Sequence, residues 1–529
     1  MYKDVAIRIS PREAASVVKL RREAARIAKI SQEDINDIRV IRRSIDARKH
    51  KVFLNLLVRL ALGEDKTVSP VINPFSYEPV GATAPVILIV GAGPAGLFAA
   101  LEAIRVGLRP IVIERGKDVD SRRLDLANIS RNKRINPASN YCFGEGGAGA
   151  YSDGKLYTRS KKRGSVEEVL QIFVQHGASE EILIDAHPHI GSDKLPHVIK
   201  AIRNTIINNG GEVRFETRFT GLLIEKGRVI GITTDKGDFK GEGVILATGH
   251  SAHDTFRALH DSGVPMSPKG IAIGVRLEHP QHLIDSIQYH NPEGRGKYLP
   301  AAEYSFVTQV DGRGVYSFCM CPGGVVVPAG SAEGELVVNG MSASARSGKW
   351  ANSGMVVEIH PGDFPEFSAS GPLQMLDLQE SLERKMYESA GSSIIAPAQR
   401  MTDFVEGKVS DSLPKSSYAP GIQPADFNVI LPPFISERLK KGFVEFGRKA
   451  KGFVTDEAIL LGLEARTSSP VRIERNSDNL QSTALRGLFP VGEGAGYAGG
   501  IVSAAIDGIR AVRAFAHHND EDHPAAKDS

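Results

Sequence analysis

A buried-type strand that runs straight into a glycine-rich turn and a helix constrains this chain more than any other feature. The apolar run Pro85–Val90 leads into the string GAGPAG, and an apolar helix is predicted from Leu97 to Val106, followed by a strand at Pro110–Ile113. In this pattern the first glycine permits a tight turn, the second lets backbone N–H groups approach a pyrophosphate, and the third lets the helix pack closely on the strand. The sequence therefore predicts a dinucleotide-binding βαβ unit.

An acidic residue stands where such a unit holds the ribose of its nucleotide. Glu114 ends the second strand, 23 residues after Gly91, and its carboxylate can accept hydrogen bonds from ribose hydroxyls. The same charge would repel a 2′-phosphate, which argues against NADP at this position. The fingerprint leaves NAD and FAD open.

A second glycine-rich helix start, about 400 residues later, favours the longer cofactor. A strand at Gly487–Val491 ends in Gly492-Glu493-Gly494, and the turn Gly496–Gly500 leads into a helix predicted from Ile501 to about Ala516. One helix N-terminus would face the pyrophosphate and the other the flavin end. Between the two lies a strand, Gly243–Ala247, that stops in a turn of small residues.

These segments resemble the glutathione-reductase-type FAD flavoproteins, over about residues 85–520. The strings NYCFGEGGAGAYSDGKL, GIAIGVRLEHPQ, YSFCMCPGGVVVPAG and LEARTSSPVRI, with the basic N-terminal region, resemble more closely an uncharacterised FAD-dependent dehydrogenase family of bacteria and plastids. The resemblance implies an α/β fold: a glutathione-reductase-type FAD-binding Rossmann-like domain with an inserted mixed α/β substrate domain and a small N-terminal α+β module. It implies FAD as the cofactor and leaves the substrate open. Glu493, where many members have Asp, is implied to contact the ribityl or pyrophosphate region.

The expected FAD contacts come from five segments. The glycine-rich stretch Asn140–Leu156 is expected at the flavin ring, with an ordinary flexible loop as the alternative, and Lys155 is a candidate to stabilise the anionic reduced flavin. The residues expected to bind the cofactor are Gly91, Ala92, Gly93, Pro94, Ala95, Gly96, Glu114, Arg115, Gly146, Gly147, Ser152, Asp153, Gly154, Lys155, Ala247, Thr248, Gly249, Gly492, Glu493, Gly500 and Ile501.

Three residues are catalytic candidates, each with a structural alternative. His250 follows the Ala-Thr-Gly turn, where a helix predicted from Ser251 would lower the pKa of its imidazole; it is either a proton donor or a polar cap. Cys319, with Cys321, is a reactive thiol, one half of a redox pair, or a buried structural cysteine. Arg466 either clamps an acidic group of the substrate or forms a structural salt bridge. The three cysteines lack metal-binding spacing, so no metal site is expected.

The chain divides into a head, a linker and a large body. The head reads as strand, helix (Pro11–Ile30), strand and strand, and the linker carries Pro70, Pro74, Pro79 and Pro85. Short strands at Glu212–Phe215, Gly221–Glu225, Val229–Thr234 and Phe239–Lys240 predict a meander without a second glycine fingerprint, so no separate NAD(P)H domain is expected. The predicted parts are 1–63, a basic α+β module; 64–85, a proline-rich linker; 86–255 and 455–516, the FAD-binding domain; 256–454, the substrate or cap domain; and 517–529, a polar frayed tail.

The head is strongly basic, although the whole chain is nearly balanced. Residues 1–63 hold 15 Lys and Arg against 7 Asp and Glu, whereas the 529-residue chain has a net charge of +3. The densest basic cluster comprises Arg39, Arg42, Arg43, Arg48, Lys49 and Lys51. It is either a solvated face or a docking surface for RNA or an acidic partner. The overall balance argues against a protein that coats nucleic acid along its whole surface.

We expect an FAD-dependent oxidoreductase, a dehydrogenase or reductase that transfers hydride between the flavin and a small-molecule substrate. NAD(P)H is a candidate transient electron donor, and an electron-donor protein is a candidate partner. The alternatives are a flavin monooxygenase, an RNA-associated flavoprotein that uses the basic module, and a non-enzymatic flavoprotein sensor. Few cysteines, no apolar signal core and no long apolar run predict a cytoplasmic protein without a membrane span.

Overall fold

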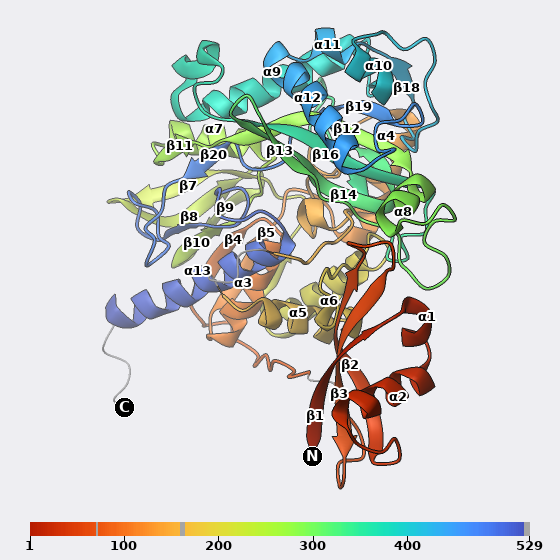
Figure 1. Ribbon diagram of the computed structural model, residues 1–529. Helices are drawn as coiled ribbons and strands as arrows, with labels where there is room; N and C mark the ends of the chain where they lie inside the picture. Colours follow the sequence, from red (N-terminus) through yellow and green to blue (C-terminus); the bar gives the residue numbers. More distant parts are fainter. Residues whose placement is uncertain (70–71, 159–163, 523–529) are drawn as a thin grey trace.

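The computed structural model describes residues 1–69, 72–158 and 164–522 of the chain (Figure 1). Three parts are distinguished by their sheets. The N-terminal module has a three-stranded sheet, the middle of the molecule has a five-stranded parallel sheet, and the upper part in Figure 1 has an eight-stranded sheet. The fold is thus α/β, with the small module, the Rossmann-like part and the mixed substrate-type part that the sequence indicates.

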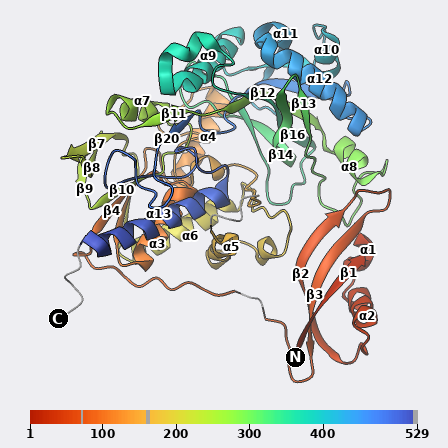
Figure 2. The ribbon, with the colours of Figure 1, turned by 60° about the vertical axis from the view of Figure 1, so that its left-hand side comes forward.

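The parallel sheet has the strand order β21-β10-β4-β5-β6, and every neighbouring pair is parallel. Its central strands are continuous runs of apolar residues because helices cover one face and a second sheet covers the other. Helices α3 and α13 lie side by side on the helical face, next to α5 and α6 (Figure 2). The bounds are β4 Val86–Val90, α3 Pro94–Arg105, β5 Arg109–Ile113, α4 Val119–Asn132, α5 Val166–Gln175, α6 Leu195–Asn208, β6 Glu212–Arg214, β10 Gly243–Leu246, α7 His253–Asp261, β21 Leu488–Pro490 and α13 Ile501–Asp522.

The predicted meander is one strand too long. Glu212–Phe215, read as its first strand, is β6, which pairs in parallel with β5 at the edge of the main sheet. The antiparallel meander consists only of β7 (Phe219–Glu225), β8 (Arg228–Thr234) and β9 (Gly237–Lys240), and it packs on the face opposite α3. A three-residue strand carries too little periodicity to distinguish the two pairings from sequence.

The eight-stranded sheet forms the body of the upper part, in the order β13-β14-β16-β12-β19-β17-β18 with β15 on β14. Helices α9 and α12 pack against it, and its core holds many buried aromatic side chains. The bounds are β11 Met266–Pro268, β12 Ile271–Pro280, α8 Gln281–Tyr289, β13 Val307–Val310, β14 Arg313–Pro328, β15 Val338–Met341, β16 Trp350–Ile359, α9 Gln374–Ser389, β17 Ala396–Arg400, α10 Met401–Glu406, β18 Ile422–Pro424, α11 Phe427–Ile430, α12 Pro433–Lys449, β19 Ile459–Glu464 and β20 Val471–Ile473.

The eight-stranded sheet extends past one of the predicted domain boundaries. The sequence assigned residues 455–516 to the FAD-binding domain, but β19 pairs with β12 and β17 inside the eight-stranded sheet. The upper part therefore extends at least to Glu464. A short apolar run is compatible with a buried strand of either sheet, so the sequence alone does not show which strands it pairs with.

The N-terminal module is a β1-β3-β2 sheet covered by α2, with β1 at Tyr2–Ile9, β2 at Ile35–Asp46 and β3 at Phe53–Leu62. The helix predicted over Pro11–Ile30 is instead two helices, α1 (Pro11–Ala14) and α2 (Val17–Ala28). The break occurs because Ser16 adopts an extended backbone and its side chain accepts a hydrogen bond from the Lys19 N–H, which caps α2.

The basic cluster of the module is used in part within the chain. Arg39 pairs with Glu180, and Arg43 pairs with Asp185 at 2.6 Å and 3.0 Å. The Arg43 N–H also donates to the Ile184 carbonyl, and the Ala186 N–H donates to the Arg43 carbonyl, each at 2.9 Å. Two of the six residues of the basic cluster thus form ion pairs within the chain, with acidic residues of the segment 180–185.

The predicted linker and tail agree with the structure in part. No helix or strand interrupts residues 64–69 and 72–85, whereas Pro70 lies outside the described residues. The tail predicted from His517 is still helical to Asp522, and residues 523–529 lie outside the description. Among the described helices, none combines the length and apolar character needed to cross a membrane.

Candidate functional site

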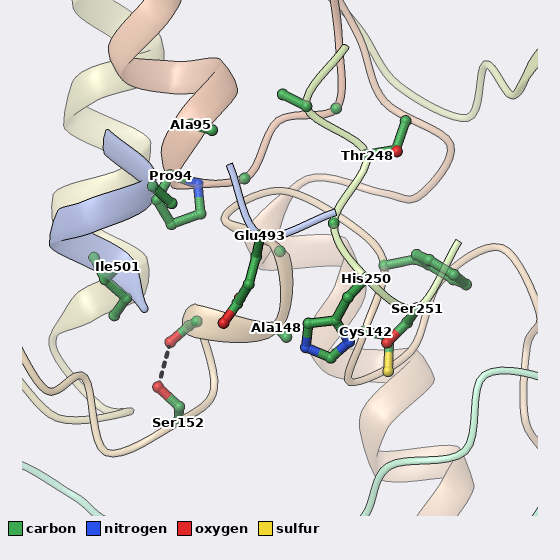
Figure 3. Close-up of a pocket in the computed structure, with 18 of the residues that line it drawn as sticks. Pro94, Ala95, Cys142, Ala148, Ser152, Thr248, His250, Ser251, Glu493 and Ile501 are labelled. Atoms are coloured by element: carbon green, nitrogen blue, oxygen red, sulfur yellow. Dashed lines mark hydrogen bonds between the residues drawn. The ribbon is translucent and has the colours of Figure 1, made fainter. Parts of the chain in front are cut away.

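A cavity of about 350 Å³ opens at the carboxyl ends of the parallel strands (Figure 3). Ligands of open α/β sheets bind in this crevice because the turns after the strands converge there. The segments that follow β4, β5, β10 and β21 all contribute to the lining, and strand β14 of the large sheet closes it with Phe318 and Cys319.

Two of the three fingerprint glycines, Gly91 and Gly96, have the structural roles that their spacing predicts. Gly91 has a φ of +107°, and a Cβ there would lie 2.4 Å from the Ala247 carbonyl oxygen. A Cβ on Gly96 would lie 1.9 Å from the Gly91 carbonyl oxygen, so only glycine allows α3 to pack this closely on the turn.

Two helix N-termini face the cavity. Helix α3 begins at Pro94 after Gly93, which provides no side-chain cap, and α13 begins at Ile501 after two exposed glycines, Gly499 and Gly500. Figure 3 shows Pro94 and Ile501 on neighbouring helix ends. Uncapped N–H groups and the helix dipoles favour an anion at this place.

Glu114 is buried and holds three segments together. Its carboxylate accepts hydrogen bonds from the backbone N–H groups of Ala92 at 2.9 Å, Gly116 at 2.9 Å and Gly144 at 3.0 Å. A carboxylate offers about four acceptor sites, so one remains for a ribose hydroxyl. Arg115 beside it also lines the cavity and pairs with Asp254 at 2.8 Å.

Glu493 lines the cavity beside the starts of α3 and α13, which Pro94 and Ile501 mark in Figure 3. Its removal from bulk water, together with the charge of Cys319, raises its pKa to about 7, against the opposing effect of Lys269. Glu493 is therefore a group that gains or loses a proton near neutral pH at the place where the helix ends favour an anion.

The glycine-rich loop lies against the fingerprint. The Gly146 N–H donates to the Ala92 carbonyl at 2.8 Å. The buried Arg122 donates to the carbonyls of Asn140, Glu145 and Gly147 at 2.8 to 2.9 Å. These bonds join residues 140–149 to the fingerprint and to Arg122, which favours a defined conformation over the flexible-loop alternative.

Near the end of this loop, the polar residues expected at the flavin already have partners in the protein. Ser152 Oγ donates to the Gly149 carbonyl at 2.8 Å, as the dashed line in Figure 3 shows. Asp153 is paired with Arg346, and Lys155 Nζ donates to the Met320 carbonyl. All three still line the cavity.

His250 lines the cavity as a neutral imidazole. Burial and the nearby charge of Arg466 lower its pKa to about 3. The pKa is lowered, as predicted, but by burial and by the charges of Arg466, His253 and Lys269, whereas the helix predicted from Ser251 begins at His253. A neutral His250 can form hydrogen bonds but holds no proton to donate as an imidazolium near pH 7.

Arg466 lines the cavity but is engaged by protein groups. It binds Glu383 at 2.8 Å and 3.0 Å and Glu335 at 2.7 Å, and its Nη1 lies 3.5 Å from Cys142 Sγ. These contacts are the salt bridges of the structural alternative, and a contact of Arg466 with a substrate stays a prediction because Arg466 also lines the cavity.

Four residues expected to bind the cofactor do not line the cavity, as far as the described residues define it: Ala92, Gly96, Gly146 and Gly492.

The sequence missed several residues that do line the cavity. Thr217 and Phe219 could have been found if β6 had been recognised as a strand of the parallel sheet. Cys142 and Phe143 lie inside the glycine-rich loop, whereas Phe318, Asn339 and Thr467 come from the upper part and carry no local signal.

The residues present fit a long, anionic dinucleotide. A Cβ at Gly93, Gly249, Gly499 or Gly500 would meet no atom within 4 Å, which leaves open space beside both helix ends. Glu114, an acidic residue suited to a ribose, lies at one side of the cavity. Residues 152–155 and strand β14 enclose its other side.

Comparison with known proteins gives three family matches. The family described as "FAD-dependent protein, C-terminal domain-like" matches residues 270–467, an FAD binding domain matches 87–127, and a domain of unknown function matches 1–61. A protein of Clostridium beijerinckii, itself called uncharacterized, is 41% identical over 508 residues, which cover 93% of this chain and 94% of that protein.

Solved structures with a similar arrangement are distant. A geranylgeranyl bacteriochlorophyll reductase-like protein from Thermoplasma acidophilum is 14% identical, with a TM-score of 0.36 over 83% of this chain and 79% of that one. A 3-ketosteroid delta1-dehydrogenase from Sterolibacterium denitrificans is 10% identical, with a TM-score of 0.34 over 82% of this chain and 99% of that one. Likeness at this level says nothing of the reaction.

Proposed function

We propose a function from the premise that this chain belongs to the family of FAD-dependent proteins, so that FAD is its cofactor. The protein is a flavin oxidoreductase that works as a dehydrogenase or reductase and transfers hydride between the flavin and a small organic molecule. Bound FAD supplies the two-electron chemistry, and the protein supplies placement and electrostatics.

The observation that carries this proposal is the convergence of distant segments on one cavity. The starts of α3 and α13 are about 400 residues apart in sequence yet face the same space, and the large sheet covers it from the other side. In this arrangement the two helix N-termini would hold the pyrophosphate, and Glu114 would accept one hydroxyl of the adenosine ribose. The substrate would then approach between loop 152–155 and strand β14.

Two cavity groups differ in the proton that they can hold. Glu493, with a pKa of about 7, can share a proton with a phosphate or a ribityl hydroxyl, whereas the neutral His250 can only orient a neighbour by hydrogen bonding. The protonatable carboxyl is therefore the better candidate for proton exchange beside the cofactor.

The test is a visible spectrum of the purified protein, recorded without oxygen before and after addition of NADH or NADPH. We expect a yellow protein with bound FAD whose flavin band is bleached by one nicotinamide or by a substrate, and reoxidised slowly when air is admitted. Fast reoxidation would indicate an oxidase or a monooxygenase instead. Protein that stays colourless after incubation with FAD would overturn the proposal.

A further inference from the structure

Two cysteines of strand β14 lie at the cavity in different environments. Cys319 is partly exposed and lines the cavity, whereas Cys321 is fully buried. The pairing of β14 with β16 shifts register between Phe318 and Cys321, so one extra residue is inserted in the ladder there. Such bulges redirect a side chain and are common beside active sites.

Cys319 also has a backbone conformation that a side chain rarely adopts. Its φ is +45°, in the left-handed region. Nonglycine residues keep such a conformation only where the surroundings enforce it, and these sites are often functional. Here the Arg276 guanidinium donates to the Cys319 carbonyl at 2.9 Å and lies 3.4 Å from Cys321 Sγ, and Lys155 Nζ holds the carbonyl of the intervening Met320.

The two cysteines are joined by a hydrogen bond and have unequal acidity. Cys321 Sγ donates to the Cys319 carbonyl oxygen at 3.4 Å. The neighbouring Cys321 thiol, with the charges of Lys155 and Arg276, lowers the pKa of Cys319 to about 6 against the opposing effects of burial and Asp153. The neighbouring Cys319 and burial raise the pKa of Cys321. Near pH 7 one sulfur is thus a thiolate facing the cavity, and its neighbour is a protonated thiol behind it.

Cys319 faces the end of the cavity that is left for the flavin. The start of α3 and Glu114 occupy the pyrophosphate and adenosine end, whereas Cys319 lies on the covering sheet with Lys155 and Asn339. This placement rests on the function proposed above.

We propose that Cys319 and Cys321 form a redox-active dithiol that exchanges two electrons with bound FAD. The Cys319 thiolate and the Cys321 thiol give up two electrons and one proton and form an S–S bond. FAD takes up both electrons and the proton to become FADH⁻, so atoms and charge balance. In the reverse direction FADH⁻ reduces the disulfide, and the Cys319 sulfur, which lines the cavity, is the one that can exchange with a disulfide-bearing substrate.

The test counts electrons in the holoprotein. Wild-type protein is oxidised with ferricyanide, desalted and titrated with dithionite without oxygen. Full bleaching of the flavin band should consume four electrons for each FAD. Cys319→Ser and Cys321→Ser variants should consume two, and a Val307→Ser control, at an exposed position of the neighbouring strand β13, should consume four. Acid-quenched samples alkylated before and after the titration should show two new thiols in the peptide that contains residues 319–321.

The outcomes separate this inference from the proposed function. Wild-type protein that binds FAD but consumes only two electrons, with no new thiols in that peptide, overturns the dithiol and leaves the flavin oxidoreductase standing. Protein that takes up no FAD overturns the proposed function. The mass of the 319–321 peptide after oxidation of wild-type protein alone still tests the disulfide if a serine variant fails to fold.

Discussion

Glu493 shows how a single residue can make cofactor affinity depend on pH. Its carboxyl lies beside the starts of α3 and α13, where an anionic pyrophosphate is expected, and its pKa is about 7 in the protein without cofactor. Lys269 and Cys319 are the charged side chains that act on it. A bound phosphate next to Glu493 would favour the protonated form of its carboxyl, because two neighbouring negative charges repel each other.

We therefore expect FAD binding to weaken as the pH rises above 7. Below pH 7, Glu493 already holds its proton in the protein without cofactor. Above pH 7 binding must take up a proton, so the Kd should rise by up to about tenfold for each pH unit. Glu493→Gln should flatten this dependence and keep tight binding at pH 9. Titration of FAD followed by fluorescence measures the Kd at each pH. Glu225→Gln, a change at an exposed carboxylate, is the control. A Glu493→Gln profile as steep as wild type would contradict the assignment.

At the scale of elements, the contact between α3 and α13 brings the two ends of the FAD site together. Gly508 on α13 lies so close to α3 that a Cβ would be 2.1 Å from the Ala95 carbonyl oxygen and 2.9 Å from its carbon. Both atoms belong to the backbone, so neither can rotate away. The helix that contributes Ile501 is thereby held at a fixed depth against the helix that contributes Pro94.

Gly508→Ala should push the two helices apart. We expect a loss of about 1–3 kcal/mol in the free energy of unfolding from overpacking, together with weaker FAD binding. Thermal melting with and without FAD measures both effects. Arg510→Ala, a change at a partly exposed position of the same helix, should leave both near wild type. A Gly508→Ala protein that melts and binds like wild type would show that the helices can separate freely.

The elements that could be predicted from sequence are those whose side chains carry strong local signals. The GAGPAG turn, Glu114 and the glycine-rich start of α13 each have a fixed mechanical role, so their places in the cavity followed from spacing. The partner of β19 and the pairing of β6 depend on contacts far along the chain, which a short apolar run does not encode. Phe318 and Asn339 reach the cavity only because the large sheet folds over it.

At the scale of the whole molecule, the basic module is attached to the body by specific contacts rather than by the linker alone. Arg43 forms an ion pair with Asp185 through two hydrogen bonds, and two backbone hydrogen bonds to residues 184 and 186 flank this pair. Ion pairs that are partly exposed contribute about 0.2–1 kcal/mol each, so reversing one charge should matter more than removing it.

Arg43→Glu should loosen the module, since the new carboxylate would face Asp185 and Glu181. We expect trypsin to cut after Lys66 in the linker severalfold faster, corresponding to about 1 kcal/mol of docking free energy. The double change Arg43→Asp with Asp185→Arg should restore slow cleavage. Arg42→Glu, at a neighbouring arginine that forms no ion pair with a described residue, is the control. Equal cleavage rates for all variants would mean that these contacts do not hold the module.

The β2–β3 hairpin of this module touches both larger parts. Arg43 reaches Asp185 beside the parallel-sheet part, and near the hairpin tip the Ala47 carbonyl lies 2.9 Å from His290 Nε2, just after α8 in the upper part. The hairpin thus links the two parts that line the cavity, through residues that lie outside the lining itself.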